Sequence, residues 1–296
     1  MPHPVIFDRK LLRARRARAA KLDPATFLIE RAADDLAGRL LAVRRRFDLA
    51  VDLGTPTDAV RRALADRVGT IVAADPIAAH VAGDRLAVVA DEEALPFRDA
   101  SLDLVVSVLA LQFVNDLPGA LIQIRRALKP DGLLLAAMVG GESLVELREA
   151  FAQAEAEVES GVSPRVAPFA DLRDLGALLQ RAGFALPVTD VDRVTVRYAS
   201  PLALMHDLRR MGAANALAER RRTLLRRSTL RRLLEIYAEK FADPDGRVRA
   251  TFEIVWLSGW APHQSQQQPL KPGSAKTRLA DVLRTQEIST GEKAGS

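Results

Sequence analysis

The chain has 296 residues, of which 48% are hydrophobic and 27% are charged, a composition typical of globular proteins. It contains no cysteine, which excludes disulfides, thiolate zinc sites, iron–sulfur clusters and a cysteine nucleophile. Only four histidines are present, and none lies within five residues of another, so no metal site is predicted. There is no apolar run of the roughly 18–20 residues that span a bilayer and no signal-peptide pattern, which predicts a cytoplasmic protein.

Charge is distributed unevenly along the sequence. The net charge is +7 over residues 1–47, −10 over 48–160 and +8 over 161–296. A groove that binds nucleic acid needs clustered positive charge, and the middle of this chain is acidic. Nucleic acid is therefore not an expected partner.

Residues 1–47 are predicted to form basic N-terminal helices. The first spans about 6–20 and has Asp8 as its N-cap, and the second begins near Pro24 or Thr26 and ends near Val43.

A different pattern begins at residue 48. Short apolar runs, the candidate strands, occupy 49–53, 70–74, 86–90, 104–108 and 133–139. Helix-length segments between and after them occupy 57–66, 76–82, 116–128 and 142–158. Apolar strands without polar alternation are buried on both faces, and alternation with helices predicts an α/β, doubly wound, Rossmann-like parallel sheet with its core at 48–139.

The second half of the chain completes this domain, which is expected to span 48–262. A helix is predicted near 170–182, ending at Gly183, and residues 186–198 and 247–260 have β character. Residues 201–241 are strongly helical in composition, which predicts a helical insertion at about 201–246 between the last two strands. Residues 263–296 are expected to form an extended or disordered tail.

Acidic residues and glycines stand at the carboxyl ends of the candidate strands, where doubly wound sheets bind their ligands. The sequence reads V-D-L-G at 51–54, A-A-D-P at 73–76, A-D-E-E at 90–93 and L-K-P-D-G at 128–132. This order resembles the class I S-adenosylmethionine-dependent methyltransferases of the methyltransferase type 11 kind. The resemblance implies S-adenosylmethionine as the cofactor.

The same resemblance assigns cofactor contacts to five residues. Asp52 and Gly54 would admit the methionine part, Asp75 would accept both ribose hydroxyls, and Asp91 with Glu92 would hold the adenine amino group. Two alternatives stay open. Asp75 could serve only as the cap of a helix that begins at Pro76, and Asp91 and Glu92 could be solvated loop charges.

Further motifs resemble the mitochondrial complex I assembly factor five family and its bacterial relatives. They are I-F-D-R (6–9), L-Q-F-V-N-D-L-P (111–118), G-G-E-S-L-V-E-L-R (140–148), S-P-R-V-A-P-F (163–169), D-L-G-A-L-L-Q-R-A-G-F (174–184), D-L-R-R-M-G-A-A-N (207–215) and P-G-S-A (272–275). The resemblance implies a methyltransferase fold, a link to assembly of NADH:ubiquinone oxidoreductase, and hydroxylation of an arginine in a peripheral-arm subunit. The biotin-pathway methyltransferase of malonyl carrier protein is similar but more distant. Because only five residues precede I-F-D-R, a bacterial cytoplasmic protein is expected.

The turn after the first strand departs from the family's D-L-G-x-G-x-G. Here Pro56 replaces a glycine and removes a backbone N–H, and Asp58 is expected to set a carboxylate near that of the cofactor. Both changes predict weakened cofactor binding. The alternative interpretation is a capping box at 55–58 with Pro56 at the first helical position. The family's imidazole is also absent, since Gln112 and Phe113 stand in L-Q-F-V.

Two functions are compatible with these observations. The first is an S-adenosylmethionine-dependent methyltransferase, or by resemblance a protein-arginine hydroxylase, that acts on a protein or carrier-protein client such as a complex I subunit. No catalytic residue is predicted, because methyl transfer needs mainly in-line positioning. The alternative is a non-catalytic assembly chaperone with a degraded cofactor loop.

Seven arginines and no acidic residue lie between Arg220 and Arg232. Leucines at 224, 225, 230, 233 and 234 with Tyr237 are predicted to form the apolar counterpart of this basic face. A solvated face is one interpretation. The other is a lid that steers an acidic client, or that contacts the anionic inner membrane peripherally.

Overall fold

The computed structural model describes residues 5–159, 161–267, 277 and 279–286. The described residues up to Pro262 form one compact unit, and those from His263 onward form a second. Both predicted N-terminal helices are present, as α1 (Arg9–Ala19) and α2 (Phe27–Leu41). The side chain of Asp8 accepts a hydrogen bond from the Leu11 amide, which confirms its predicted capping role.

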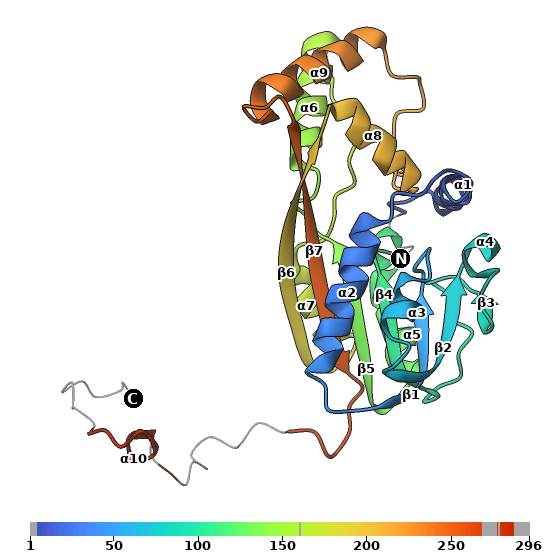
Figure 1. Cartoon of the computed structure of the whole chain (residues 1–296), viewed down its shortest axis with the longest axis vertical. Helices are drawn as coiled ribbons and strands as arrows, with labels where there is room; N and C mark the ends of the chain where they lie inside the picture. The colour runs from blue at the N-terminus through green and yellow to red at the C-terminus, as the bar shows by residue number, and fades with distance from the viewer. Residues whose placement is uncertain (1–4, 160, 268–276, 278, 287–296) are drawn as a thin grey trace. The chain divides into compact units, whose positions relative to one another are not determined.

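The central layer is a seven-stranded sheet in the order β3-β2-β1-β4-β5-β7-β6 (Figure 1). Its strands are β1 Phe47–Leu53, β2 Val68–Asp75, β3 Ala87–Val89, β4 Leu102–Val108, β5 Leu128–Val139, β6 Ala185–Tyr198 and β7 Val248–Trp260. The first five strands pair in parallel, and β7 runs antiparallel to both β5 and β6. The predicted α/β doubly wound sheet finished by a strand pair is therefore confirmed.

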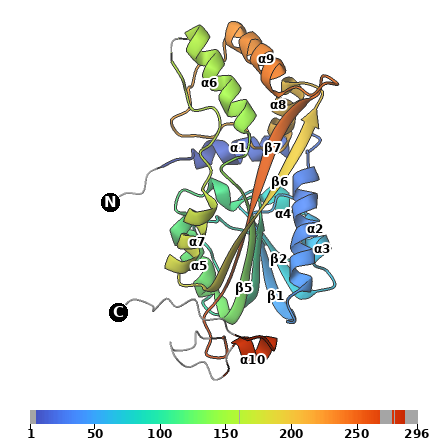
Figure 2. The ribbon, with the colours of Figure 1, turned by 90° about the vertical axis from the view of Figure 1, so that its left-hand side faces the viewer.

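Helices cover both faces of this sheet (Figure 2). On one face α2 and α3 (Ala59–Ala63) pack through Leu36, Val60 and Leu64. On the other, α5 (Leu117–Ala127) and α7 (Leu172–Arg181) pack through Leu121 and Leu179. A short helix, α4 (Ala78–Val81), follows β2, and a 3-10 turn, η1 (Leu111–Phe113), follows β4. The sheet is thus buried on both faces, as its apolar strands predict.

A third core lies where β6 and β7 extend beyond the parallel strands. There α6 (Val145–Glu159), α8 (Pro201–Arg210) and α9 (Arg227–Phe241) gather around Tyr237 and Phe252 (Figure 1). The insertion between β6 and β7 is therefore confirmed, although it is less helical than predicted. Residues 211–226 form turns and loop, because α8 ends at Arg210 and Gly212, which follows its C-cap, has a φ of +70°.

The tail also differs from its prediction. A short helix, α10 (Leu279–Leu283), stands within residues that were expected to be extended or disordered. The P-G-S-A motif at 272–275 lies outside the described residues. No helix in the described part of the chain is both long and apolar enough to cross a membrane.

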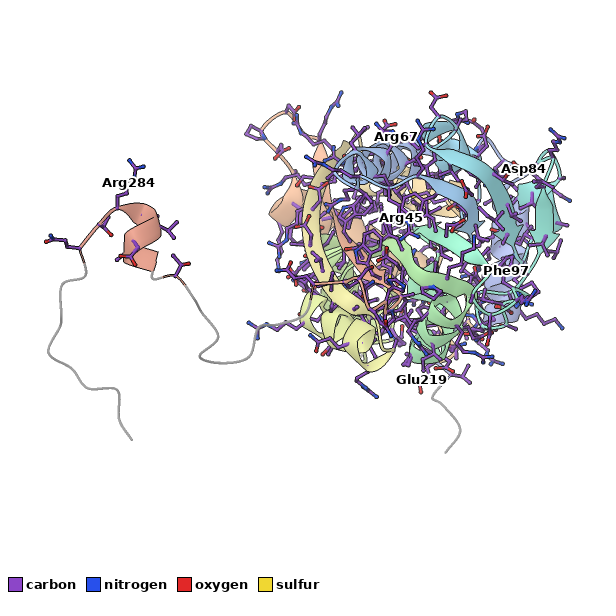
Figure 3. The ribbon with its side chains drawn as sticks, turned by 90° about the horizontal axis from the view of Figure 1, so that it is seen from below. Arg45, Arg67, Asp84, Phe97, Glu219 and Arg284 are labelled. Carbon is purple, nitrogen blue, oxygen red and sulfur yellow. The ribbon has the colours of Figure 1, made fainter. Side chains whose placement is uncertain are left out.

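The segment that precedes α1 is bonded to two other parts of the fold. Phe7 pairs with Leu217 in an antiparallel bridge, and the Asn115 side chain accepts hydrogen bonds from the amides of Ile6 and Phe7. These contacts hold α1 over the carboxyl ends of the strands. Arg45 and Arg67, which precede β1 and β2, mark the opposite end of the sheet (Figure 3).

Candidate functional site

The carboxyl ends of β1, β2 and β3 bring the five predicted site residues together. Asp52 and Gly54 end β1, Asp75 ends β2, and Asp91 with Glu92 follows β3. The Gly54 amide donates to the Ala74 carbonyl, which joins the β1 turn to β2. Parallel strands end at one edge of a sheet, so the order in the sequence becomes a cluster in space.

Gly54 is required by its backbone and by its surroundings. Its φ is +77°, which L side chains rarely adopt. A Cβ at this position would lie 2.6 Å from the Ala110 Cβ and 3.0 Å from Glu92 Oε1. Gly54 is the first glycine of the family's D-L-G-x-G-x-G turn. Its positive φ and the close approach of Ala110 and Glu92 exclude any other residue there.

Asp52 is a buried carboxylate paired with Arg61, which also binds Asp84. Burial raises the pKa of Asp52 to about 7, although hydrogen bonds from Thr55 and Arg61 oppose the shift. One of its oxygens, Oδ1, is buried, and no described residue makes a hydrogen bond to it. An unpartnered buried oxygen costs free energy that a bound ligand can recover.

Asp75 is fully buried, and the helix-cap interpretation of it is wrong, because α4 begins at Ala78 with Ile77 as its N-cap. Oδ1 accepts a hydrogen bond from the Ile77 amide at 2.7 Å and lies 3.0 Å from His80 Nδ1. Oδ2 is buried and has no partner in the described residues. One oxygen therefore shapes the turn into α4, and the other remains available to a ligand.

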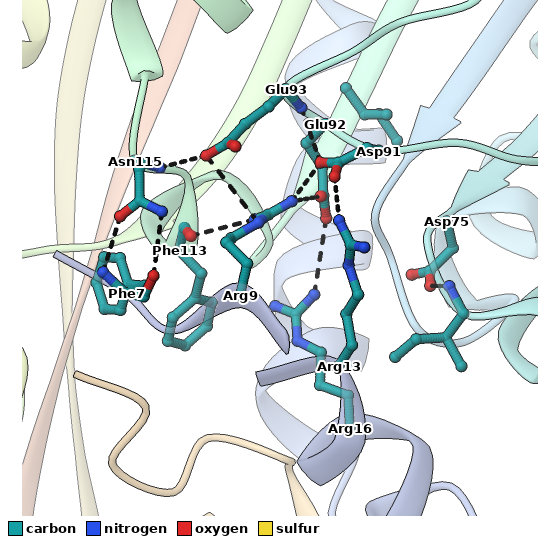
Figure 4. Close-up of polar contacts among 12 residues, drawn as sticks. Phe7, Arg9, Arg13, Arg16, Asp75, Asp91, Glu92, Glu93, Phe113 and Asn115 are labelled. Atoms are coloured by element: carbon teal, nitrogen blue, oxygen red, sulfur yellow. Dashed lines mark hydrogen bonds and ion pairs between the residues drawn. The ribbon is translucent and has the colours of Figure 1, made fainter. Parts of the chain in front are cut away.

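Asp91 and Glu92 are held by arginines of α1 (Figure 4). Arg9 bonds to Asp91 and, at 2.5 Å, to Glu92 Oε2, while Arg13 bonds to Asp91. Arg16 lies 3.7 Å from Glu92 Oε1, an oxygen that accepts no hydrogen bond within the part of the chain that the structure describes. The interpretation of these two acids as solvated loop charges is wrong, because Glu92 is fully buried and Asp91 is only 27% exposed.

The pKa of Asp91 follows from this pairing. Its partial burial alone would raise the pKa, but the Glu93 amide and the guanidinium groups of Arg9 and Arg13 outweigh burial and lower it. Asp91 is therefore a charged group whose oxygens are already occupied. The resemblance assigns Asp91 to the adenine amino group. To bind that group, Asp91 would have to give up its ion pair with Arg9 or Arg13.

The arginines of α1, with Arg61 and His80, are the site residues that sequence reasoning missed. A signal for the first group exists, since positions 9, 13 and 16 fall on one face of a helix and so can reach one target together. No local pattern indicates Arg61 or His80, whose partners are set by the strand-end geometry.

The turn after β1 corrects two predictions. The capping box at 55–58 is wrong, because α3 begins at Ala59 and Thr55 Oγ1 instead accepts a bond from the Val108 amide at 3.3 Å. Asp58 does not set its carboxylate in the cofactor site, since it is exposed and pairs with Arg62 one turn along. Of the two changes expected to weaken cofactor binding, only Pro56 lines the site.

A cavity of about 470 Å³ adjoins these strand ends. Its walls come from α1, α2, α8, the turn after β1, η1, and the loops at 165–169 and 213–216. Apolar side chains such as Leu28, Phe151, Met205 and Leu208 form most of its surface. Within the described residues, no group of three or more histidine or acidic side chains is arranged to hold a metal ion.

The arginines between Arg220 and Arg232 lie outside this cavity, and most of them have acidic partners. Arg220 pairs with Asp8, Arg221 and Arg226 with Glu159, and Arg232 with Glu157, Glu235 and Glu239. The predicted apolar counterpart is correct at Leu233 and Tyr237, which are buried, and wrong at Leu224, which is 93% exposed because it lies in the loop before α9.

Known proteins are similar to this chain in sequence over most of its length. The Methyltransferase domain family matches residues 51–136, which span β1 to β5. The arginine-hydroxylase NDUFAF5 of Danio rerio is 39% identical over 97% of this chain and 92% of its own length, and that of Homo sapiens is 40% identical over 94% and 83%. The chain belongs to the NDUFAF5 family.

Other relatives of this chain have a name that states a different activity. A malonyl-acyl-carrier-protein O-methyltransferase of Halorhodospira halophila is 36% identical over 90% of this chain and 92% of its own length. The methyltransferase domain supports S-adenosylmethionine, the cofactor that the sequence predicted.

Solved structures show the same fold. The Bacillus halodurans protein BH2331 aligns with a TM-score of 0.52 at 20% identity, covering 77% of this chain and 99% of its own. The YcgJ protein of Bacillus subtilis aligns with a TM-score of 0.53 at 14% identity, covering 77% and 98%. At these identities the likeness concerns the fold alone.

Proposed function

We propose that this protein is an S-adenosylmethionine-dependent enzyme of the methyltransferase superfamily that acts on a protein or carrier-protein client. The observation that carries the proposal is the set of three buried carboxylates at adjoining strand ends, each with one oxygen that has no hydrogen-bond partner. They are Asp52 Oδ1, Asp75 Oδ2 and Glu92 Oε1, and none of the three has a hydrogen-bond partner among the described residues. Buried polar atoms are usually hydrogen-bonded, so three orphans around one glycine turn indicate a ligand with several donors.

The donor pattern of S-adenosylmethionine fits these residues. Asp75 would accept the ribose hydroxyls through Oδ2, Glu92 would accept from the adenine amino group, and Asp52 with Gly54 would border the amino-acid part. The cofactor supplies a methyl group on a sulfonium. This chain's residues would bind and orient it and exclude water, which is most of what methyl transfer demands of an enzyme.

The client is proposed from the family. The relatives named arginine-hydroxylase NDUFAF5 support our proposal that this protein acts in assembly of respiratory complex I, with a subunit of that complex as the client. The relatives named malonyl-acyl-carrier-protein O-methyltransferase make a carrier-protein client the next choice. A bacterial cytoplasmic location, with peripheral contact at the inner membrane, accompanies either client.

A non-catalytic assembly chaperone is the second candidate, and the α1 arginines favour it. Arg9, Arg13 and Arg16 engage Asp91 and Glu92, the two acids that the resemblance assigns to the adenine amino group. Pro56 also removes a backbone N–H from the turn that contacts cofactor in the family. Such a protein would bind its client through the methyltransferase fold without transferring a methyl group to it.

Calorimetric titration with S-adenosylmethionine separates the two candidates. The enzyme predicts saturable binding at one site per chain, tightened by Pro56→Gly, which restores close backbone approach. Absence of binding at millimolar cofactor, by a protein that is folded by circular dichroism, would contradict the enzyme and favour the chaperone.

A further inference from the structure

His80 connects a site acid with the cavity beside the strand ends. The residue belongs to α4, and its imidazole is one of the side chains that line this cavity. Its Nδ1 atom lies 3.0 Å from Oδ1 of Asp75. Only 5% of the histidine side chain is exposed, and the carboxylate is fully buried. A ligand that approaches Asp75 from the cavity therefore meets the imidazole as well.

The two nitrogens of this imidazole have different surroundings. A carboxylate oxygen only accepts hydrogen bonds, so Nδ1 carries the ring proton and donates it to Asp75. The neutral ring then has a lone pair on Nε2. Within the described residues, Nε2 of His80 makes no hydrogen bond. It is thus an unused acceptor on a ring that is held by its other nitrogen and lines the cavity.

Asp75 holds the imidazole and is itself held. The Ile77 amide donates to the same oxygen, Oδ1, at 2.7 Å, so two donors converge on it. The backbone amide of His80 also donates to the Ile77 carbonyl at 2.9 Å, which anchors the start of α4. The second carboxylate oxygen, Oδ2, is buried and accepts no hydrogen bond from the described residues. The pair therefore carries two unused acceptors, one on each side chain.

A ribose presents a matching pair of donors. Its 2′ and 3′ hydroxyls are neighbours on one ring, and each can donate one hydrogen bond. A carboxylate ligand would offer no donor to these acceptors, and a single hydroxyl would satisfy only one of them. Two acceptors on one fixed pair of side chains therefore suit a vicinal diol.

We propose that His80 is a second ribose-binding residue, whose Nε2 accepts a hydrogen bond from one hydroxyl while Oδ2 of Asp75 accepts from the other. The inference rests on the proposed function, since the ribose is that of the cofactor. It divides between two residues the contacts that the family resemblance assigns to Asp75 alone. It also gives Oδ1 of Asp75 a task, which is to orient the imidazole.

The test is calorimetric displacement of bound S-adenosylhomocysteine from the full chain by adenosine, 2′-deoxyadenosine and 3′-deoxyadenosine. Each deoxynucleoside should bind the wild type about threefold or more less tightly than adenosine, the effect of one lost hydrogen bond. In His80→Asn, one of the two missing hydroxyls should cost nothing, because its acceptor is gone, and the other should keep its full cost. A histidine with a merely structural role would weaken all three nucleosides alike.

Two substitutions separate contact from positioning. Asparagine keeps a side-chain N–H that can reach Asp75, but it has no atom at the place of Nε2. Glutamine is longer, and its amide oxygen can reach that place. His80→Gln should therefore bind adenosine more tightly than His80→Asn. The reverse order would show that the histidine only positions Asp75 and would overturn the proposal. His206→Asn, at an exposed histidine of α8, is the matched control and should leave every affinity unchanged.

The outcomes separate this inference from the proposed function. If S-adenosylhomocysteine binds, but each missing hydroxyl costs the same in His80→Asn as in the wild type, the inference fails and the proposed function stands. Failure of S-adenosylhomocysteine to bind the wild type contradicts both. Nitrogen NMR of the wild type covers a loss of folding in the variants. The Nε2 resonance of His80 should shift when adenosine is added, and a resonance that does not respond would overturn the inference without any substitution.

Discussion

The molecule has two arginine-rich segments, α1 and residues 220–232, and they differ in where their guanidinium groups lie. In α1, Arg9 and Arg16 are 13% and 7% exposed and face acids at the strand ends. In the second segment, Arg226 and Arg231 are 62% and 80% exposed, and their acidic partners lie 3.9 and 3.7 Å away. Similar composition thus produces a buried ion-pair cluster in α1, whereas the second segment combines partly buried pairs at Arg220, Arg221 and Arg232 with solvated arginines.

This difference shows that burial, and not arginine content, decides what a basic segment does. A buried pair repays its desolvation only with good geometry, and removal of one partner leaves an uncompensated charge. Exposed pairs contribute little and are screened by salt. The α1 cluster should therefore respond strongly to substitution and weakly to salt, whereas the exposed Arg226 and Arg231 should respond weakly to substitution and strongly to salt.

The largest effect is expected for Arg9→Met. This change leaves Glu92, which is fully buried, with only the distant Arg16, and it removes one of the two arginines on Asp91. Breaking a buried pair of this kind should lower the free energy of unfolding by about 3 kcal/mol, measured by urea denaturation. Arg18→Met on the exposed face of α1 is the control. Equal stabilities of the two variants would contradict the distinction between buried and exposed arginines.

A smaller effect is expected in the pH dependence of stability, through Asp52. Its pKa is about 7 in the folded chain and near 3.8 when unfolded. Between these values the native state binds more protons than the unfolded state, so Asp52 makes stability fall as the pH rises from about 4 to about 7. Asp52→Asn should therefore gain stability relative to wild type between pH 5 and pH 8 in urea denaturation. Parallel curves for the two proteins would show that Asp52 is ionised throughout.

The smallest effect on stability is expected for reversal of Arg226, Arg227 and Arg231 to Glu. All three are exposed, so the urea midpoint should stay unchanged. If the segment meets an anionic membrane, the triple variant should bind phosphatidylglycerol vesicles less well than wild type at low salt and equally at high salt. Vesicle binding that is the same at low salt would leave the segment as a solvated face only.

The sequence predicted the parts of the fold that repeat a local pattern. Apolar runs located the strands to within a few residues, and the insertion between β6 and β7 followed from two β segments that bracket a helical one. The strand-end acids were found because parallel strands must end at one edge. The prediction of helix at residues 211–226 was wrong. It rested on composition, which does not indicate that Gly212 adopts a positive φ and ends the helical stretch.

The partners of the site acids could not be predicted. Arg9 and Asp91 are 82 residues apart, and their contact depends on how the bridge between Phe7 and Leu217 holds α1. Asp58 is the opposite case. It was expected in the cofactor site, but its carboxylate pairs with Arg62, four residues further along the chain. Local spacing indicates which side chains share a face, whereas tertiary packing decides what that face meets.

The cofactor affinity of Asp75→Asn tests the central claim most directly. Asparagine keeps an oxygen for the Ile77 amide and His80, but its amide nitrogen cannot accept a ribose hydroxyl where Oδ2 now stands. Calorimetry with S-adenosylhomocysteine should therefore show a loss of about 1–3 kcal/mol in binding, with the melting temperature unchanged. Equal affinities of wild type and variant would contradict the assignment of Asp75 to the cofactor and reduce it to the residue that shapes the turn into α4.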